Sequence, residues 1–136
     1  MWCRIINMLA LGVLVLVPSC RINLDRRWNQ KEALSSLKTI REAERSFKVK
    51  KEDGKYGTLV ELGAAELIDP SLASGIKDGY RFEVRIKGNS FEAIAVPIKY
   101  LETGIMSLYL DETGVIRYGD KKGGEANAND SPIDSQ

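Results

Sequence analysis

Histidine is absent from this chain of 136 residues, and cysteine occurs only twice, as Cys3 and Cys20. Without histidine the chain lacks the commonest metal ligand in proteins and the usual general base near neutral pH. Serine–histidine and cysteine–histidine catalysis are therefore excluded. Both cysteines lie within the first twenty residues, so the body of the chain has no disulfide framework and its stability must come from packing.

The acidic residues do not form a pattern typical of a catalytic pair either. Dense acidic sequences occur at Asp111-Glu112 and at Asp130 with Asp134. Each is interpreted as part of a turn or a tail rather than as a catalytic pair. We therefore expect no enzymatic activity, no cofactor and no small-molecule substrate.

Charge is balanced over the whole chain, at a formal +1, but it is uneven along it. From Arg21 to Lys51 ten Lys or Arg stand against four Asp or Glu, whereas from Glu52 onward nine stand against fifteen. A basic segment beside a membrane anchor is attracted to anionic headgroups. The alternative interpretation of this basic segment is a helix face exposed to solvent. Nucleic acid is not an expected partner, because no aromatic residues are interleaved with the cations and the rest of the chain is acidic.

The first twenty residues have the character of an export signal. A single Arg4 precedes an apolar run from Ile5 to Val17, which is shorter than the about 20 residues that a membrane span needs. Ser19 before Cys20, with Val17 three positions before that cysteine, resembles the lipobox of bacterial lipoproteins. In that family the signal is removed and the new N-terminal cysteine is acylated; an uncleaved anchor with an incidental cysteine is the alternative.

This resemblance implies the organisation of the N-terminal part. Residues 1–19 are a lipoprotein-type signal peptide or a short N-terminal anchor, Cys20 is the lipidation site, and residues 20–28 are a juxtamembrane linker. The remaining chain then faces the periplasm or the exterior on a membrane of the cell envelope. Arg21, rather than aspartate, follows the lipid site, which favours the outer membrane. Trp28 is either an anchor residue at the membrane interface or a staple against the start of the next helix.

A long helix is predicted in the first half of the chain. Asn29 and Glu32 have the spacing of a capping box, and neither Pro nor Gly follows until Gly54. A helix is therefore expected from about Gln30 to Lys51.

The apolar residues of this segment gather on one side. At 100° per residue a single stripe contains Ala33, Leu37, Ile40 and Phe47, with Ala43 at its edge. Glu44 falls inside the same stripe, where an isolated carboxylate is costly. We expect Glu44 to be paired with a Lys or Arg rather than to act as a catalytic acid.

Strands are predicted in the second half. They follow two short helical turns, at 59–62 (capped by Thr58) and 64–68, and a loop at 70–75. Apolar alternation and turn residues then predict four strands: Tyr80–Ile86, Phe91–Val96, Met106–Leu110 and Val115–Tyr118. The expected fold is α+β, with one long N-terminal helix packed on a four-stranded antiparallel sheet. Residues 119–136 offer almost no apolar surface and are predicted to be a disordered tail.

This order of elements and several short sequences resemble the type IV pilin and type II secretion pseudopilin superfamily, in particular its short bacterial members. The sequences are SLKTI at 36–40, GKYG at 54–57, PSLASG at 70–75, GYRF at 79–82, AVP at 95–97 and DETGVIRY at 111–118. They cover roughly residues 33–118 and make residues 29–118 a pilin-like globular domain. The resemblance implies a long helix whose C-terminal half packs on an antiparallel sheet, and a non-enzymatic role in envelope filaments or secretion pseudopili.

The chain departs from the pilin pattern at its N-terminus. Pilins carry a Gly-Phe-Thr-Leu-Ile-Glu type sequence after a basic leader, and this chain has none. Residues 1–8 contain no acid, and residues 21–27 are too charged for a buried filament core. The leading hypothesis is a membrane-anchored pilin-like lipoprotein with a structural or protein-binding role, whose partners are pilus or secretion-system proteins. The alternative is an atypical minor pilin or pseudopilin that retains its N-terminal membrane segment.

The same resemblance raises the question of calcium. Some pseudopilins bind calcium through carboxylates in a loop near their last strands. By that analogy Asp111, Glu112 and Asp120 form a candidate calcium loop. Turn formation is the favoured interpretation of these residues, and no resident metal is expected.

Overall fold

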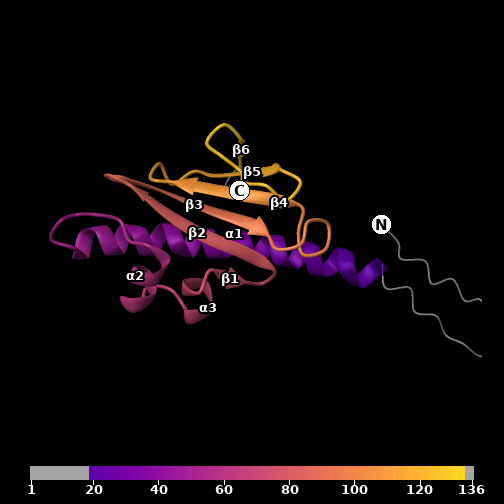
Figure 1. The fold of residues 1–136 in the computed structure, drawn as a ribbon, viewed down its shortest axis with the longest axis horizontal. Helices are drawn as coiled ribbons and strands as arrows, with labels where there is room; N and C mark the ends of the chain where they lie inside the picture. The colour runs from indigo at the N-terminus through magenta and orange to yellow at the C-terminus, as the bar shows by residue number, and fades with distance from the viewer. Residues whose placement is uncertain (1–18, 134–136) are drawn as a thin grey trace, which may run out of the picture.

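The computed structural model describes residues 19–133, with side chains from Leu24 onward, and consists of one long helix beside one antiparallel sheet (Figure 1). The predicted signal segment, apart from Ser19, lies outside the described residues. The elements are α1 (Ser19–Lys50), α2 (Leu59–Ala64), α3 (Pro70–Ala73), β1 (Ile76–Lys77), β2 (Tyr80–Lys87), β3 (Ser90–Pro97), β4 (Met106–Asp111), β5 (Ile116–Asp120) and β6 (Ser131–Pro132).

Helix α1 begins about ten residues earlier than predicted. Neither Pro nor Gly occurs between Ser19 and Lys50, so nothing in this segment interrupts the backbone hydrogen bonds of a helix. The predicted linker at 20–28 is therefore helical. The predicted capping box is wrong, because Asn29 lies inside the helix and its Nδ2 donates a 3.0 Å hydrogen bond to the carbonyl oxygen of Thr103.

The sheet confirms the predicted α+β class but has six strands rather than four. Its order is β1-β2-β3-β4-β5-β6, with every neighbouring pair antiparallel. The four predicted strands are β2 to β5, and β1 and β6 are two-residue strands at the edges. Strands of two residues are too short to produce an alternation of apolar and polar positions. Only pairing to a neighbour reveals them.

The two short helices that follow α1 in the sequence, before the first strand, are both capped by side chains. The Thr58 hydroxyl accepts a 3.3 Å hydrogen bond from the Glu61 amide, which confirms the predicted cap of α2. The segment predicted as a loop at 70–75 contains α3 instead. Asp69 caps α3 by accepting a 2.9 Å hydrogen bond from the Leu72 amide, and Pro70 occupies the first turn, where its missing N–H costs nothing.

One apolar core lies between α1 and the sheet. Figure 1 shows α1 running along the sheet, and its closest contacts are with the central strands β3 and β4. The predicted stripe is confirmed as the buried side of the helix. Its five residues join the sheet side chains in one cluster, which includes Ala33, Leu37, Ile40, Ala43, Phe47, Phe82, Phe91, Ala93, Leu108 and Leu110.

The predicted disorder from Gly119 onward does not hold for residues 119–133. Ala126 is buried against Ile94 and Tyr109 on the face of the sheet opposite the α1 side of the core. The Ser107 hydroxyl donates a 2.6 Å hydrogen bond to the Gly124 carbonyl oxygen, and β6 pairs with β5. The segment is therefore held mostly by polar contacts, which a low content of apolar residues does not reveal.

Candidate functional site

The side of α1 that faces away from the sheet carries both exposed cations and exposed apolar residues. At 100° per residue its members fall within an arc of roughly 100°, opposite the buried stripe. All are exposed, and we call them the outward face: Leu24, Arg27, Trp28, Lys31, Ser35, Lys38, Glu42, Arg45, Ser46 and Val49.

Three members of the outward face are apolar and unusually exposed. Leu24 is 64 % exposed, Trp28 60 % and Val49 86 %. The ammonium nitrogen of Lys31 lies 5.9 Å from the centre of the Trp28 ring, within cation–π range. Because Trp28 lies inside α1, the predicted staple at a helix start is wrong. Its placement at a membrane interface remains a prediction.

The charged members are mostly cations. Arg27, Lys31, Lys38 and Arg45 stand against the single carboxylate of Glu42. That carboxylate is 3.2 Å from Arg45 and 3.2 Å from Arg41, so it is itself partly neutralised. Asp25 and Glu32 border the face on one side. The outward face thus combines a positive surplus with apolar residues near both of its ends.

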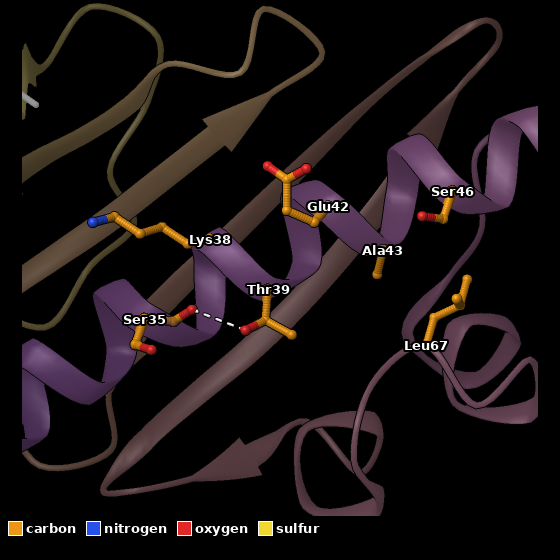
Figure 2. A pocket seen from close by; sticks show the side chains of 7 residues that line it. All are labelled: Ser35, Lys38, Thr39, Glu42, Ala43, Ser46 and Leu67. Carbon is orange, nitrogen blue, oxygen red and sulfur yellow. Dashed lines mark hydrogen bonds between the residues drawn. The ribbon is translucent and has the colours of Figure 1, made fainter.

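A shallow groove of about 400 Å³ follows the flank of this face (Figure 2). It is lined by Ser35, Lys38, Thr39, Glu42, Ala43, Ser46 and Leu67. Figure 2 shows Leu67, from the segment after α2, opposite the helix. The Thr39 hydroxyl donates a 3.1 Å hydrogen bond to the Ser35 carbonyl oxygen and is not paired with a base. The groove offers contact surface rather than the parts of a catalytic site.

The N-terminal third of α1 is fastened to the loop between β3 and β4. The Gln30 Oε1 accepts hydrogen bonds of 2.8 Å from the Ile105 amide and 3.1 Å from the Met106 amide. Arg26 donates a 2.8 Å hydrogen bond to the Leu101 carbonyl oxygen. Together with the Asn29 contact, these bonds set the direction of α1 relative to the sheet. The sequence carries no signal for them, because the partners are more than seventy residues apart.

Glu44 is the one described side chain with a buried oxygen that lacks a hydrogen-bond partner. Its Oε2 accepts a 2.9 Å hydrogen bond from the Gly57 amide, and Oε1 has no partner. The predicted pairing with a Lys or Arg is therefore wrong. Burial raises the pKa of Glu44 to about 7, the Gly57 hydrogen bond opposes this increase, and the charge of Glu61 adds to it.

The three carboxylates of the candidate calcium loop do not come together. Asp111 accepts a 3.0 Å hydrogen bond from the Thr113 amide in the β4–β5 turn. Asp120 pairs with Met106 at the opposite end of that hairpin, roughly 15 Å away by strand geometry. Within residues 19–133, no group of three or more His, Cys, Asp or Glu is placed to hold a metal ion.

Cys20 lies in the first turn of α1, and its side chain lies outside the described part of the structure. Among the helices of residues 19–133, none combines the length and hydropathy that crossing a bilayer requires. Comparison of the chain with protein-family models, curated proteins and solved structures finds no match. The pilin and lipoprotein resemblances therefore rest on the short sequences that suggested them.

Proposed function

We propose that this protein is a membrane-anchored, pilin-like envelope lipoprotein with a structural or protein-binding role and no catalytic activity. One observation carries the proposal: Cys20, the proposed lipidation site, already belongs to α1, the helix that also forms half of the core. The anchor and the domain then share one continuous element. No flexible linker separates them.

A helical connection has mechanical consequences. From Cys20 to Gln30 the helix rises about 15 Å, and at Gln30 it is hydrogen-bonded to the loop before β4. A domain attached in this way is held at a defined distance and orientation from its anchor. This suits a protein that presents a surface to a fixed partner, such as a component of a pilus or a secretion system.

The atypical minor pilin or pseudopilin remains the second candidate. The favouring observation is again the length of α1, because a long N-terminal helix packed on an antiparallel sheet is the arrangement that the pilin resemblance implies. In this case residues 1–18 are retained and Cys20 is not acylated. The two candidates therefore differ in a property that can be measured.

Metabolic labelling with a clickable fatty acid distinguishes them. We expect the wild-type protein to be labelled and Cys20→Ala to lose the label. Cys3→Ala is the matched control, because Cys3 is the only other cysteine and belongs to the segment that is removed. We also expect the intact mass of the mature protein to lack residues 1–19. An unlabelled protein that retains Met1 would contradict the lipoprotein assignment and support the minor pilin.

A further inference from the structure

We propose that the outward face of α1 lies along an anionic lipid surface, so that the helix runs parallel to the membrane and the sheet points away from it. The inference rests on the proposed membrane anchor, and it adds an orientation and a lipid class. The occupant of the face is the same bilayer that holds the anchor.

The positions of the exposed apolar residues favour a parallel helix. Leu24 and Trp28 lie near one end of the face and Val49 at the other, about 38 Å apart along the axis. A helix standing upright on its anchor would carry Val49 far beyond the headgroups. Only a helix that lies flat lets both ends of the face contact the lipid.

The cations lead to the same orientation. Arg27 and Arg45 are eighteen residues apart on α1, which corresponds to about 27 Å. Attraction to an anionic surface fades within a Debye length, about 8 Å in physiological salt. An upright helix would leave Lys38 and Arg45 outside this range, whereas a flat helix brings all the cations of the face within it.

Lipid is favoured over an acidic protein by the distance to the anchor. Cys20 precedes Leu24 by about one helical turn. Acyl chains attached there bring the Leu24 and Trp28 end of the face to the bilayer. Trp is a residue typical of the membrane–water interface. An acidic protein partner would be attracted by the same cations but has no relation to the anchor.

Tryptophan fluorescence of the acylated protein tests the orientation. In Trp2→Phe the only tryptophan is Trp28, and the protein is reconstituted into vesicles of phosphatidylcholine with or without phosphatidylglycerol. With lipids brominated near the headgroup, we expect a blue shift and a loss of Trp28 emission in both kinds of vesicle, because the nearby anchor brings Trp28 to the bilayer. A second reporter, Val49→Trp in a chain with Trp2→Phe and Trp28→Phe, is expected to be quenched in the anionic vesicles only.

Two controls accompany these reporters. Ala128→Trp in the same tryptophan-free background places the probe in the segment that covers the opposite face of the sheet, and we expect no quenching there. Lys31→Glu with Lys38→Glu reverses two exposed charges of the outward face. We expect these changes to return the quenching of Val49→Trp in anionic vesicles to the level seen with phosphatidylcholine alone.

The outcomes separate this inference from the proposed function. Protein that floats with the vesicles but leaves Val49→Trp unquenched would show an upright helix and overturn the inference. Equal quenching of Val49→Trp in neutral and anionic vesicles would overturn the proposed preference for anionic lipid. Protein that fails to float at all would refute the proposed anchor, and the inference with it.

Discussion

At the scale of single residues, Glu44 has the most direct effect on local structure. Its carboxylate holds the Gly57 amide, which fixes the turn that follows α1. There is little space around this contact, because a Cβ on Gly57 would lie 2.8 Å from the Phe47 ring. A carboxylate in such a site stabilises the turn by a hydrogen bond and destabilises the fold by its own desolvation.

These two opposing effects predict that the free energy of unfolding depends on pH. The pKa of Glu44 is about 7 in the folded protein against an ordinary 4.5, so between these values the folded state binds more protons than the unfolded state. The free energy of unfolding therefore falls as pH rises through this window, by on the order of 2 kcal/mol from this group. We expect Glu44→Gln to remove this slope and to be more stable than the wild type at pH 8.

Urea unfolding at pH 5 and pH 8 measures the effect. Glu42→Gln is the matched control, since Glu42 lies on the same helix but is exposed, and we expect it to leave the slope unchanged. A Glu44→Gln protein with the same pH dependence as the wild type would show that Glu44 is not the group responsible.

At the scale of elements, the segment after β5 is held in place by a charge cluster. Arg85 on β2 contacts Glu125 at 2.7 Å and Glu83 at 2.8 Å. The guanidinium lowers the pKa of both carboxylates below their usual range. Lys121 pairs with Asp130 at 2.7 Å within the same segment. The apolar part of the attachment is small: Ala126 is buried, and Ile133 packs against the core while remaining partly exposed.

We therefore expect Arg85→Ala to loosen this segment without unfolding the sheet. Amide hydrogen exchange of residues 121–130 should become several-fold faster, because these contacts contribute about 1 kcal/mol or less at a partly exposed site. Exchange in β3 and β4 should not change. Lys87→Ala, on the same strand and the same face but paired with Glu92 rather than Glu125, is the control. If the amides of residues 121–130 exchange at the same rate in both variants, the proposed attachment through Arg85 is contradicted.

At the scale of the whole molecule, α1 and the sheet share a single core. Leu37 is fully buried between them, so the helix has no independent apolar cluster that would keep it folded alone. Unfolding should therefore be one cooperative transition. We expect Leu37→Ala to lower the free energy of unfolding by about 2–5 kcal/mol.

Far-UV and near-UV circular dichroism check this prediction. The helix signal and the signal of the buried tyrosines should disappear at the same urea concentration, in the wild type and in Leu37→Ala. Leu24→Ala removes an exposed leucine of the same helix and should change stability by less than about 0.5 kcal/mol. Two separate transitions would indicate that α1 is stable without the sheet.

Much of this architecture followed from local patterns. The apolar stripe of the helix, the Thr58 cap and the four longer strands were all predicted, because periodicity and capping depend on neighbouring residues. The start of α1 differs from the prediction, because the Asn29–Glu32 spacing has the form of a cap although Asn29 lies inside the helix. Tertiary contacts use Asn29 for another purpose, the hydrogen bond to Thr103.

The outward face could be located only in part. The basic character of residues 21–51 and the ambiguity of Trp28 were visible, but their arrangement on one unpartnered side of a helix requires knowing where the helix begins. The candidate calcium loop shows the opposite case, in which residues that are close in the sequence are far apart in the fold. Asp111 and Asp120 are close in sequence, yet a hairpin carries them to opposite ends of two paired strands.

Composition and periodicity alone thus determined the fold class, the core side of the helix and the exclusion of histidine chemistry, since these depend on residue type and short-range spacing. Tertiary structure decided the two edge strands, the docking of the segment after β5 and the environment of Glu44. Strand β6, the docked segment and Glu44 depend on hydrogen bonds or ion pairs between residues that are separated in the sequence, whereas β1 pairs locally with β2 and is too short to produce a periodic pattern. Such contacts are specified by three-dimensional geometry, and no local pattern records them.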